Sequence, residues 1–262
     1  MESKPLKRVV DTIKSFGIEY IFRLEKKDPQ YRAVCNIVNR HGEVLGARLV
    51  LYNALISYRL LGKGEEHWEY FSTYFSKNIY DICRDFIKYI EESPYLKLRV
   101  EARKRRILKI CNYTPDIEDV ESTLVKLSKL LNASPDQKTL TFAIKILNYV
   151  YMCSRGVDRM LPFTIPIPVD YRVAYLTWCS GLTDLLPHEG VKKHREIQSI
   201  WNEVARLTNI PPLHIDTILW LGGRAVLYGE NIHGVSNKII EIFRWREECR
   251  TPLRRSQATS EV

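Results

Sequence analysis

Apolar residues recur every three or four positions along most of the chain, which is the spacing of amphipathic helices. Within 134–153, the stripe Leu140, Ala143, Ile144, Leu147, Val150 and Tyr151 marks the face of a helix that packs against a core. Alternating apolar and polar residues, which indicate strands, are scarce, and a short extended piece is expected only near 20–24. The pattern therefore predicts an all-α protein. Helices are expected at 30–39, 46–61, 65–75, 76–92, 96–111, 117–131, 134–153, 171–181, 190–208, 212–220 and 232–248.

The chain is long enough to bury a sizeable core in one domain or two lobes. The loop 156–169 is the expected connection between the lobes, and the polar tail 254–262 is expected to be disordered. We treat residues 1–262 as a single domain made of two helical lobes. No internal repeat and no low-complexity linker interrupts the sequence.

Composition excludes several classes of protein. Hydrophobic residues make up 45% of the chain, yet no apolar run reaches the ~18 residues of a membrane span. The N-terminal residues lack the apolar segment of a secretory signal, so a cytoplasmic location is expected. The six cysteines lie at least 26 positions apart (179 − 153), which indicates neither a zinc site nor an iron–sulfur cluster. We expect most of them to be reduced core residues, and we expect no metal or organic cofactor.

Basic residues outnumber acidic ones, giving a net charge of +9 and a pI of about 9.2. The excess gathers in 99–109, in 192–195 and near the C-terminus. A polyanionic partner is expected, because basic side chains that neutralise phosphates release counterions. Charge alone does not separate DNA from RNA, and basic surfaces also occur in proteins with no nucleic-acid role.

Lys138 is placed where a helix should begin. Ser134 and Gln137 fit a capping box, with Pro135 at the first helical position. The positive end of the helix dipole disfavours a cation there and so favours the free amine, which is the nucleophilic form. Phe142 lies four residues on and shares a helix face with Lys138. The alternative is a solvated lysine beside a core phenylalanine.

Asp170 also marks a predicted helix start. Pro162, Pro166 and Pro168 enforce an extended approach, and a helix follows from Tyr171. A carboxylate held there can activate an amine and stabilise positive charge that develops on a sugar. Helix capping alone, worth about 1 kcal/mol, is the alternative. The two roles are compatible because a capping carboxylate is ionised and fixed in direction.

The segment DQKTLTFAIKILNYV is followed, 32 residues after its lysine (170 − 138), by the aspartate of IPIPVDYRVAYLTW. From about residue 30 to 220, the chain resembles the archaeal 8-oxoguanine DNA glycosylase/AP lyase family. That family (archaeal GO glycosylase) is a divergent branch of the helix-hairpin-helix DNA glycosylases. The resemblance implies a two-lobed helical fold with the active site in the interlobe cleft. It also implies that Lys138 attacks the sugar and that Asp170 assists.

The same resemblance implies a base pocket made by Gln30, Trp68, Phe142, Asp216 and Trp220. Trp68 and Phe142 are the candidate stacking walls for an extruded base. Trp68 also shares helical spacing with two other aromatic residues, as a core stripe would, and Asp216 could be a paired structural acid. The glycine-rich hairpin LPGVG of the wider superfamily is absent, and the lysine-to-aspartate gap is longer than usual there. The archaeal branch shares both irregularities.

The chemistry of 8-oxoguanine explains why such a pocket needs hydrogen-bond acceptors. Only the oxidised guanine carries hydrogen on N7, so an acceptor aimed at N7 faces another acceptor when the base is undamaged. That mismatch costs about 1–3 kcal/mol. Gln30 and Asp216 could supply acceptors, and the Trp220 N–H could donate to a carbonyl.

The expected function is a base-excision-repair DNA glycosylase/AP lyase. It would remove 8-oxoguanine through a lysine Schiff base and then cleave the strand by β-elimination. The expected partner is damaged DNA, single- or double-stranded, and the expected form is a monomer associated with the nucleoid and not with a membrane. Two alternatives stay open, namely a related glycosylase for another damaged base and a non-catalytic helical DNA-binding module.

Overall fold

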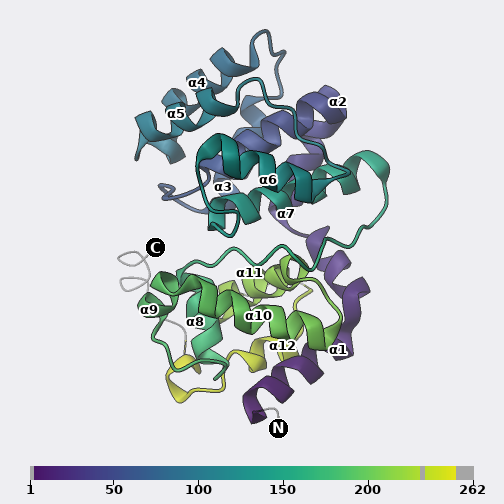
Figure 1. The fold of residues 1–262 in the computed structure, drawn as a ribbon, viewed down its shortest axis with the longest axis vertical. Helices are drawn as coiled ribbons and strands as arrows, with labels where there is room; N and C mark the ends of the chain where they lie inside the picture. Colours follow the sequence, from purple (N-terminus) through teal and green to yellow (C-terminus); the bar gives the residue numbers. More distant parts are fainter. Residues whose placement is uncertain (1–2, 231–233, 252–262) are drawn as a thin grey trace. The chain divides into compact units, whose positions relative to one another are not determined.

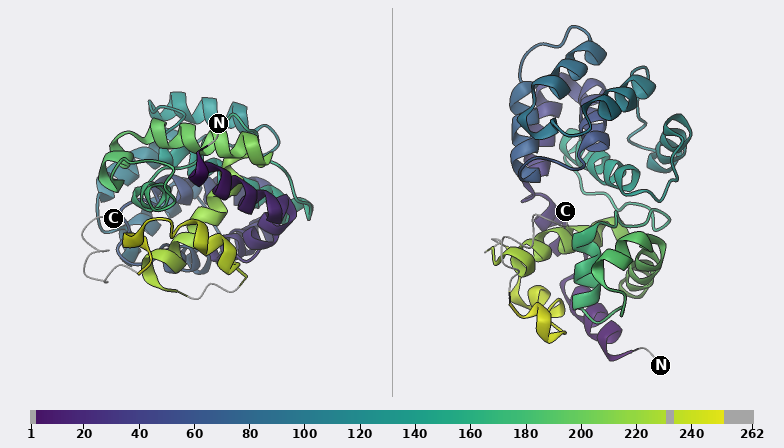
Figure 2. Two further views of the ribbon diagram at one scale, coloured as in Figure 1. Left: turned by 90° about the horizontal axis from the view of Figure 1, so that it is seen from below. Right: turned by 90° about the vertical axis from the view of Figure 1, so that its left-hand side faces the viewer.

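The structure is a computed structural model that describes residues 3–230 and 234–251. Every regular element among these residues is a helix, as the apolar spacing predicts (Figures 1 and 2). The expected tail at 254–262 lies outside the described residues. The chain divides into two compact units, which we call the middle unit (residues 26–159) and the terminal unit (residues 1–25 and 160–262). The boundary at 159/160 falls inside the expected connecting loop.

The middle unit is built on two long helices that pack along each other, α2 (Pro29–Ile56) and α7 (Lys138–Arg155). Around them lie α3 (Gly64–Tyr74), α4 (Ile82–Glu92), the 3₁₀ turn η1 (Pro94–Leu96), α5 (Val100–Ile110) and α6 (Val120–Leu131). Helix α2 covers the expected segment 30–39 and the expected segment 46–61 as far as Ile56, with a break in helical geometry only at Gly42 (φ 76°, ψ 173°). Glycine reaches this backbone region without steric penalty, so one helix bends where the apolar pattern suggests two.

The terminal unit contains α1 (Lys4–Glu25), α8 (Tyr171–Cys179), α9 (Pro187–Lys192), α10 (His194–Thr208), α11 (Pro212–Tyr228), α12 (Asn237–Ile242) and the 3₁₀ turn η2 (Glu247–Cys249). In Figure 1 its helices are purple at the N-terminus and green to yellow toward the C-terminus. Their apolar faces meet in one core, in which Ile13, Ile197, Trp201 and Leu219 are fully buried. A helix at the N-terminus is absent from the sequence prediction.

The extended piece expected near 20–24 is wrong, because these residues belong to α1. Gly17 (φ 71°, ψ 175°) interrupts the helical geometry, so the apolar residues before and after it do not form one continuous stripe. Several boundaries also differ. The expected helix 190–208 is split at Lys193, and α11 continues to Tyr228, where Gly229 ends it in the left-handed conformation. The expected helix 232–248 is reduced to α12 and η2 in its described part.

The expectation of reduced cysteines is also wrong. All six cysteines pair in disulfides, namely Cys35–Cys153, Cys83–Cys111 and Cys179–Cys249. Each bridge stays within one unit and spans a Cα–Cα distance of 5.3–5.7 Å. The paired residues are 28 to 118 positions apart, so sequence spacing gives no sign of their proximity.

Candidate active site

Lys138 is the first residue of α7, and its side chain is exposed. The expected capping box is not formed, because Gln137 occupies the N-cap position and makes no side-chain cap bond. Ser134 and Pro135 instead lie in a turn before the helix, where the Gln137 N–H donates to the Ser134 carbonyl at 3.0 Å. The amine nevertheless lies at the positive end of an 18-residue helix, as the sequence predicts.

One face of α7 continues below Lys138 with residues four, seven and eleven positions further on. Phe142 is half-buried, whereas Lys145 and Tyr149 are buried. A buried lysine two turns from the candidate nucleophile is a feature that the sequence analysis missed. The only signal in the sequence was its position inside an apolar run.

Asp28 connects this face of α7 to the start of α2. Its carboxylate caps α2 by accepting the Gln30 N–H at 2.9 Å, and the Tyr149 hydroxyl donates to it at 3.3 Å. Burial raises the pKa of Asp28 to about 6, although the positive charge of Lys145 and these hydrogen bonds act in the opposite direction. Gln30, a predicted pocket residue, is therefore held on rigid backbone with its side chain 4% exposed.

Trp68 contacts Phe142 edge to face, with ring centroids 6.4 Å apart and an interplanar angle of 70°. It also meets Phe71 at 5.5 Å, and both residues are buried together with Phe75. The aromatic stripe of α3 is thus part of the core. The helical spacing of Trp68 with its two aromatic neighbours predicts this as the alternative to a stacking wall. Trp68 reaches the half-buried Phe142 from within that core. The middle unit in this way brings Trp68 and Phe142 into contact, and Gln30 lies at the start of α2, the helix that packs along α7.

Asp170 and the remaining predicted residues belong to the terminal unit. Asp170 is the N-cap of α8, and its Oδ1 accepts the Val173 N–H at 3.0 Å. Asp216 and Trp220 lie one turn apart on α11, Asp216 buried and Trp220 half-buried. The guanidinium carbon of Arg172 lies 3.9 Å from the centroid of the Trp220 ring. Arg172 was missed by the sequence analysis.

A buried hydrogen-bond network fixes the start of α11. His214 Nδ1 lies 2.8 Å from Glu25 Oε1, and its Nε2 accepts the Leu161 N–H at 3.0 Å. An acceptor at Nε2 places the proton on Nδ1, so a neutral imidazole donates to the carboxylate. Glu25 and Leu161 flank the two points where the chain passes from one unit to the other. The network holds these points to the helix that carries Asp216 and Trp220.

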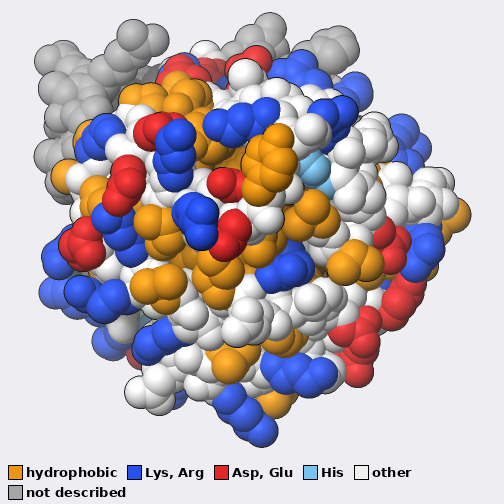
Figure 3. Space-filling view, turned by 90° about the horizontal axis from the view of Figure 1, so that it is seen from above, with side chains coloured by type: hydrophobic (Ala, Val, Ile, Leu, Met, Phe, Trp, Pro, Cys, Tyr) orange, Lys and Arg blue, Asp and Glu red, His pale blue; other side chains and the backbone are white. Residues whose placement is uncertain are grey.

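Part of the basic segment 99–109 serves the fold. Arg103 is fully buried, and its guanidinium donates to the backbone carbonyls of Ile56, Tyr58, Arg59 and Leu96. Arg106 donates to the Leu55 carbonyl at 2.8 Å. Arg99, Arg105 and Lys109 are exposed and can meet phosphates, and so are Lys192, Lys193 and Arg195. On the face shown in Figure 3, basic side chains alternate with acidic and apolar ones.

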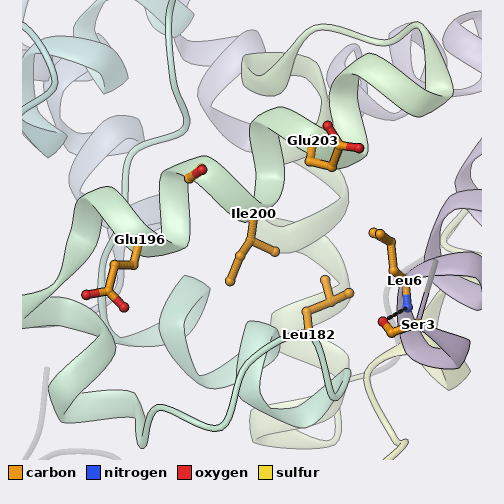
Figure 4. A pocket seen from close by; sticks show the side chains of 7 residues that line it. Ser3, Leu6, Leu182, Glu196, Ile200 and Glu203 are labelled. Carbon is orange, nitrogen blue, oxygen red and sulfur yellow. Dashed lines mark hydrogen bonds between the residues drawn. The ribbon is translucent and has the colours of Figure 1, made fainter. Parts of the chain in front are cut away.

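Two of the cavities in the described residues bear on the choice of site. One of about 460 Å³ lies in the terminal unit between α1, α10 and the loop after α8, lined by Leu6, Leu182, Ile200 and flanking polar residues (Figure 4). None of its lining residues belongs to the predicted site. The other, of about 220 Å³, lies between α2 and α3 and includes Pro29, the neighbour of Gln30. Both have acidic residues at their walls.

Two classes of site are not found in the described part of the chain. No group of three or more His, Cys, Asp or Glu residues there could hold a metal ion. None of the helices described is long and apolar enough to cross a membrane.

The described part of the chain is all-helical, with an exposed lysine at the start of α7 and an aspartate that caps α8. Residues 10–251 match the family model AGOG, described as N-glycosylase/DNA lyase. The chain belongs to this family. It is 63% identical over 248 residues to the N-glycosylase/DNA lyase of Pyrobaculum aerophilum, covering 94% of this chain and 97% of that protein.

More distant relatives carry the same name. The N-glycosylase/DNA lyase of Methanopyrus kandleri is 32% identical over 208 residues, which are 76% of this chain and 81% of that protein. Among solved structures, the chain is similar to the 8-oxoguanine DNA glycosylase of Pyrobaculum aerophilum crystallised with 8-oxoguanosine. The TM-score is 0.92 at 63% identity, over 95% of this chain and 99% of that one. The resemblance seen in the sequence and the all-helical fold are thus confirmed.

Proposed function

We propose that this protein is a bifunctional DNA glycosylase/AP lyase of base excision repair that removes 8-oxoguanine and then cleaves the strand. Membership of the N-glycosylase/DNA lyase family supports both activities. The similar protein from Pyrobaculum aerophilum, named as an 8-oxoguanine DNA glycosylase, supports the substrate. The observation that carries the proposal is the exposed amine of Lys138 at the first residue of α7.

Lys138 is proposed as the nucleophile. Its Nζ forms a bond to C1′ of the nucleotide while the bond between C1′ and the base breaks, and the base leaves with its electron pair and takes up a proton. The lone pair of the deprotonated Nζ then expels O4′, which takes up a proton as the C1′–O4′ bond breaks, and a Schiff base forms between Lys138 and the opened sugar. Loss of a proton from C2′ breaks the C3′–O3′ bond, which cleaves the strand on the 3′ side. Water finally releases the sugar and restores the amine.

Asp170 is proposed to assist the first step. The capping bond from the Val173 N–H holds its carboxylate in one direction. A fixed negative charge stabilises the positive charge that develops on the sugar as the base leaves, and it can accept the proton that Nζ loses as it bonds to C1′. The Asp170 side chain in this way both caps α8 and takes part in catalysis.

Gln30, Phe142, Asp216, Trp68 and Trp220 are proposed to form the base pocket. Asp28 holds the backbone that carries Gln30, and the Trp68 ring contacts Phe142. Acceptors on Gln30 and Asp216 would distinguish the N7–H of the oxidised base from the N7 lone pair of guanine. We further infer that the two units are lobes of one glycosylase domain and that the monomer acts on DNA at the nucleoid.

A panel of DNA duplexes tests the substrate. Each duplex carries one modified base, and release of the free base and cleavage of the strand are followed separately. We expect release from 8-oxoguanine and none from undamaged guanine. Release from a different modified base alone would favour the related-glycosylase alternative. Tight binding without release from any duplex would favour the non-catalytic DNA-binding module.

A further inference from the structure

Arg172 and Trp220 form a stacked pair between two packed helices of the terminal unit. Arg172 is the second residue of α8, two positions after Asp170, and Trp220 lies on α11. The guanidinium carbon is 3.9 Å from the centroid of the indole ring, which is within the range of a strong cation–π contact. Arginine suits this geometry because its planar guanidinium lies flat on aromatic faces. The contact covers one face of the Trp220 ring with the guanidinium group.

Gly223 makes room for this pair. A Cβ at position 223 would lie 2.7 Å from Cδ and 2.9 Å from Cγ of Arg172, and 3.0 Å from Cδ1 of Leu176. Glycine within a helix is less stable than alanine, so its presence in α11 calls for a local reason. The space for the Arg172 stem supplies that reason. The neighbouring Gly222 faces the Phe243 ring instead.

Hydrogen-bond donors gather at the stacked pair. Nε and Nη1 of Arg172 and Nε1 of Trp220 are buried, and none of the three has a hydrogen-bond partner within the described residues. Guanidinium and indole groups are donors only, so any partner must bring acceptors. Buried donors without partners are unfavourable, and in a native protein they call for an explanation. A substrate group rich in acceptors would satisfy them.

We propose that Arg172 is a positioning residue for base recognition, which holds the Trp220 indole in place and forms with it a donor cluster for a carbonyl edge of the extruded base. This inference rests on the proposed function, because 8-oxoguanine carries carbonyl oxygens on both of its rings. A phosphate is the other acceptor that arginine commonly binds. The donors are buried beside a flat indole, and this surrounding favours the planar edge of the base, and not a phosphate of the DNA backbone, as their acceptor.

Two substrates separate these roles. One duplex contains 8-oxoguanine, and the other contains a preformed abasic site, from which the base is already absent. In single-turnover assays, we expect Arg172→Met to lower base excision at least about tenfold, as loss of a charged hydrogen-bonding group does. Cleavage at the abasic site should stay within about twofold of the wild-type rate, because no base is bound there. Arg172→Lys keeps the charge but not the planar group, so it should not restore excision.

Arg224→Met is the matched control. Arg224 also lies on α11, but its guanidinium is paired with Glu230 at 2.8 Å. Loss of this charge should leave excision close to the wild-type rate. Thermal unfolding of each variant verifies that the terminal unit remains folded.

Two further single variants test the inference without a substitution at Arg172 itself. Gly223→Ala should displace the Arg172 stem and reduce excision, whereas Gly222→Ala should not. Trp220→Phe keeps an aromatic ring but removes the N–H. Because Arg172 acts partly through this ring, the double variant with Arg172→Met should lose less activity than the product of the two single effects.

Several outcomes would overturn the inference. Equal losses on the 8-oxoguanine and abasic duplexes would assign Arg172 to the DNA backbone or to the fold. Unchanged excision by Arg172→Met, or independent effects in the double variant, would remove the link to Trp220. A wild-type protein that leaves 8-oxoguanine in place would overturn the proposed function as well, which the variants alone cannot do.

Discussion

The rings of Trp68 and Phe142 meet edge to face, with centroids 6.4 Å apart and planes inclined by 70°. A base stacked between two parallel rings needs faces about 7 Å apart, twice the roughly 3.4 Å spacing of stacked bases. The observed arrangement has no such parallel gap. If both rings are to contact a base, the half-buried Phe142 must turn, because Trp68 is held in the core by Phe71.

Substitution of these two rings should therefore have different effects. Phe142→Ala should reduce base excision strongly and stability only modestly, since the ring is half-buried. Trp68→Ala should lower the free energy of unfolding by about 3–5 kcal/mol, as removal of a large buried ring does. Urea unfolding and single-turnover excision measure the two effects. A strongly unfolded Phe142→Ala protein would place this ring in the core.

Asp170→Asn should slow excision while it preserves the fold. Asparagine caps helices about as well as aspartate, so α8 keeps its N-terminal hydrogen bond, but the charge is lost. Asp170→Ala should also slow excision and in addition lower stability by about 1 kcal/mol. Single-turnover rates and melting temperatures of the two variants separate the roles. Near wild-type excision by Asp170→Asn would leave capping as the only duty of this residue.

Asp28 should make stability depend on pH in an unusual direction. Its folded pKa is raised from 3.8 to about 6, chiefly by burial. Between these values, the folded protein retains a proton that the unfolded chain releases. Its contribution to stability therefore falls as pH rises through this window, by on the order of 2–3 kcal/mol. Urea unfolding from pH 4 to 7 should show that Asp28→Asn abolishes this decline.

Asp81 provides a control of opposite sign. It caps α4 on the surface, and the hydrogen bond from the Arg84 N–H holds the pKa of its carboxyl below the ordinary value. The contribution of Asp81 to stability is present above pH 3.8, the ordinary pKa, and is lost as pH falls below it. Asp81→Asn should thus lower stability by a nearly constant amount from pH 4 to 7, without the decline that Asp28 causes as pH rises. An Asp28→Asn protein with the wild-type pH profile would contradict the account of the buried carboxyl.

A disulfide that encloses a longer stretch of chain should stabilise the fold more, with the logarithm of the length enclosed. Cys35–Cys153 spans 118 positions, compared with 28 for Cys83–Cys111. In the chain-entropy account, the longer loop restricts the unfolded state more, so Cys35→Ser should lower stability more than Cys83→Ser, by about 1 kcal/mol. Thiol labelling of the denatured protein verifies the pairing. Six free thiols in protein prepared without reductant would contradict it.

The sequence predicts the parts of this protein that depend on neighbouring residues. The start of α8 and its Asp170 cap follow from prolines and a capping residue a few positions apart, and the long α7 follows from its apolar stripe. Long-range partners do not show in such patterns. The disulfide partners, the backbone carbonyls that bury Arg103, and the buried Lys145 near Asp28 depend on tertiary packing. The helix α1 was missed because Gly17 breaks its stripe.

The central claim is that Lys138 is the nucleophile, and borohydride trapping on a duplex with one 8-oxoguanine tests it most directly. Borohydride reduces a Schiff base to a stable covalent link between protein and DNA. The wild-type protein should form this adduct with the damaged duplex and not with the undamaged one. The surface control Lys129→Gln should behave in the same way. Lys138→Gln should form none and should release no base. An adduct from Lys138→Gln at the wild-type level would contradict the assignment of the nucleophile.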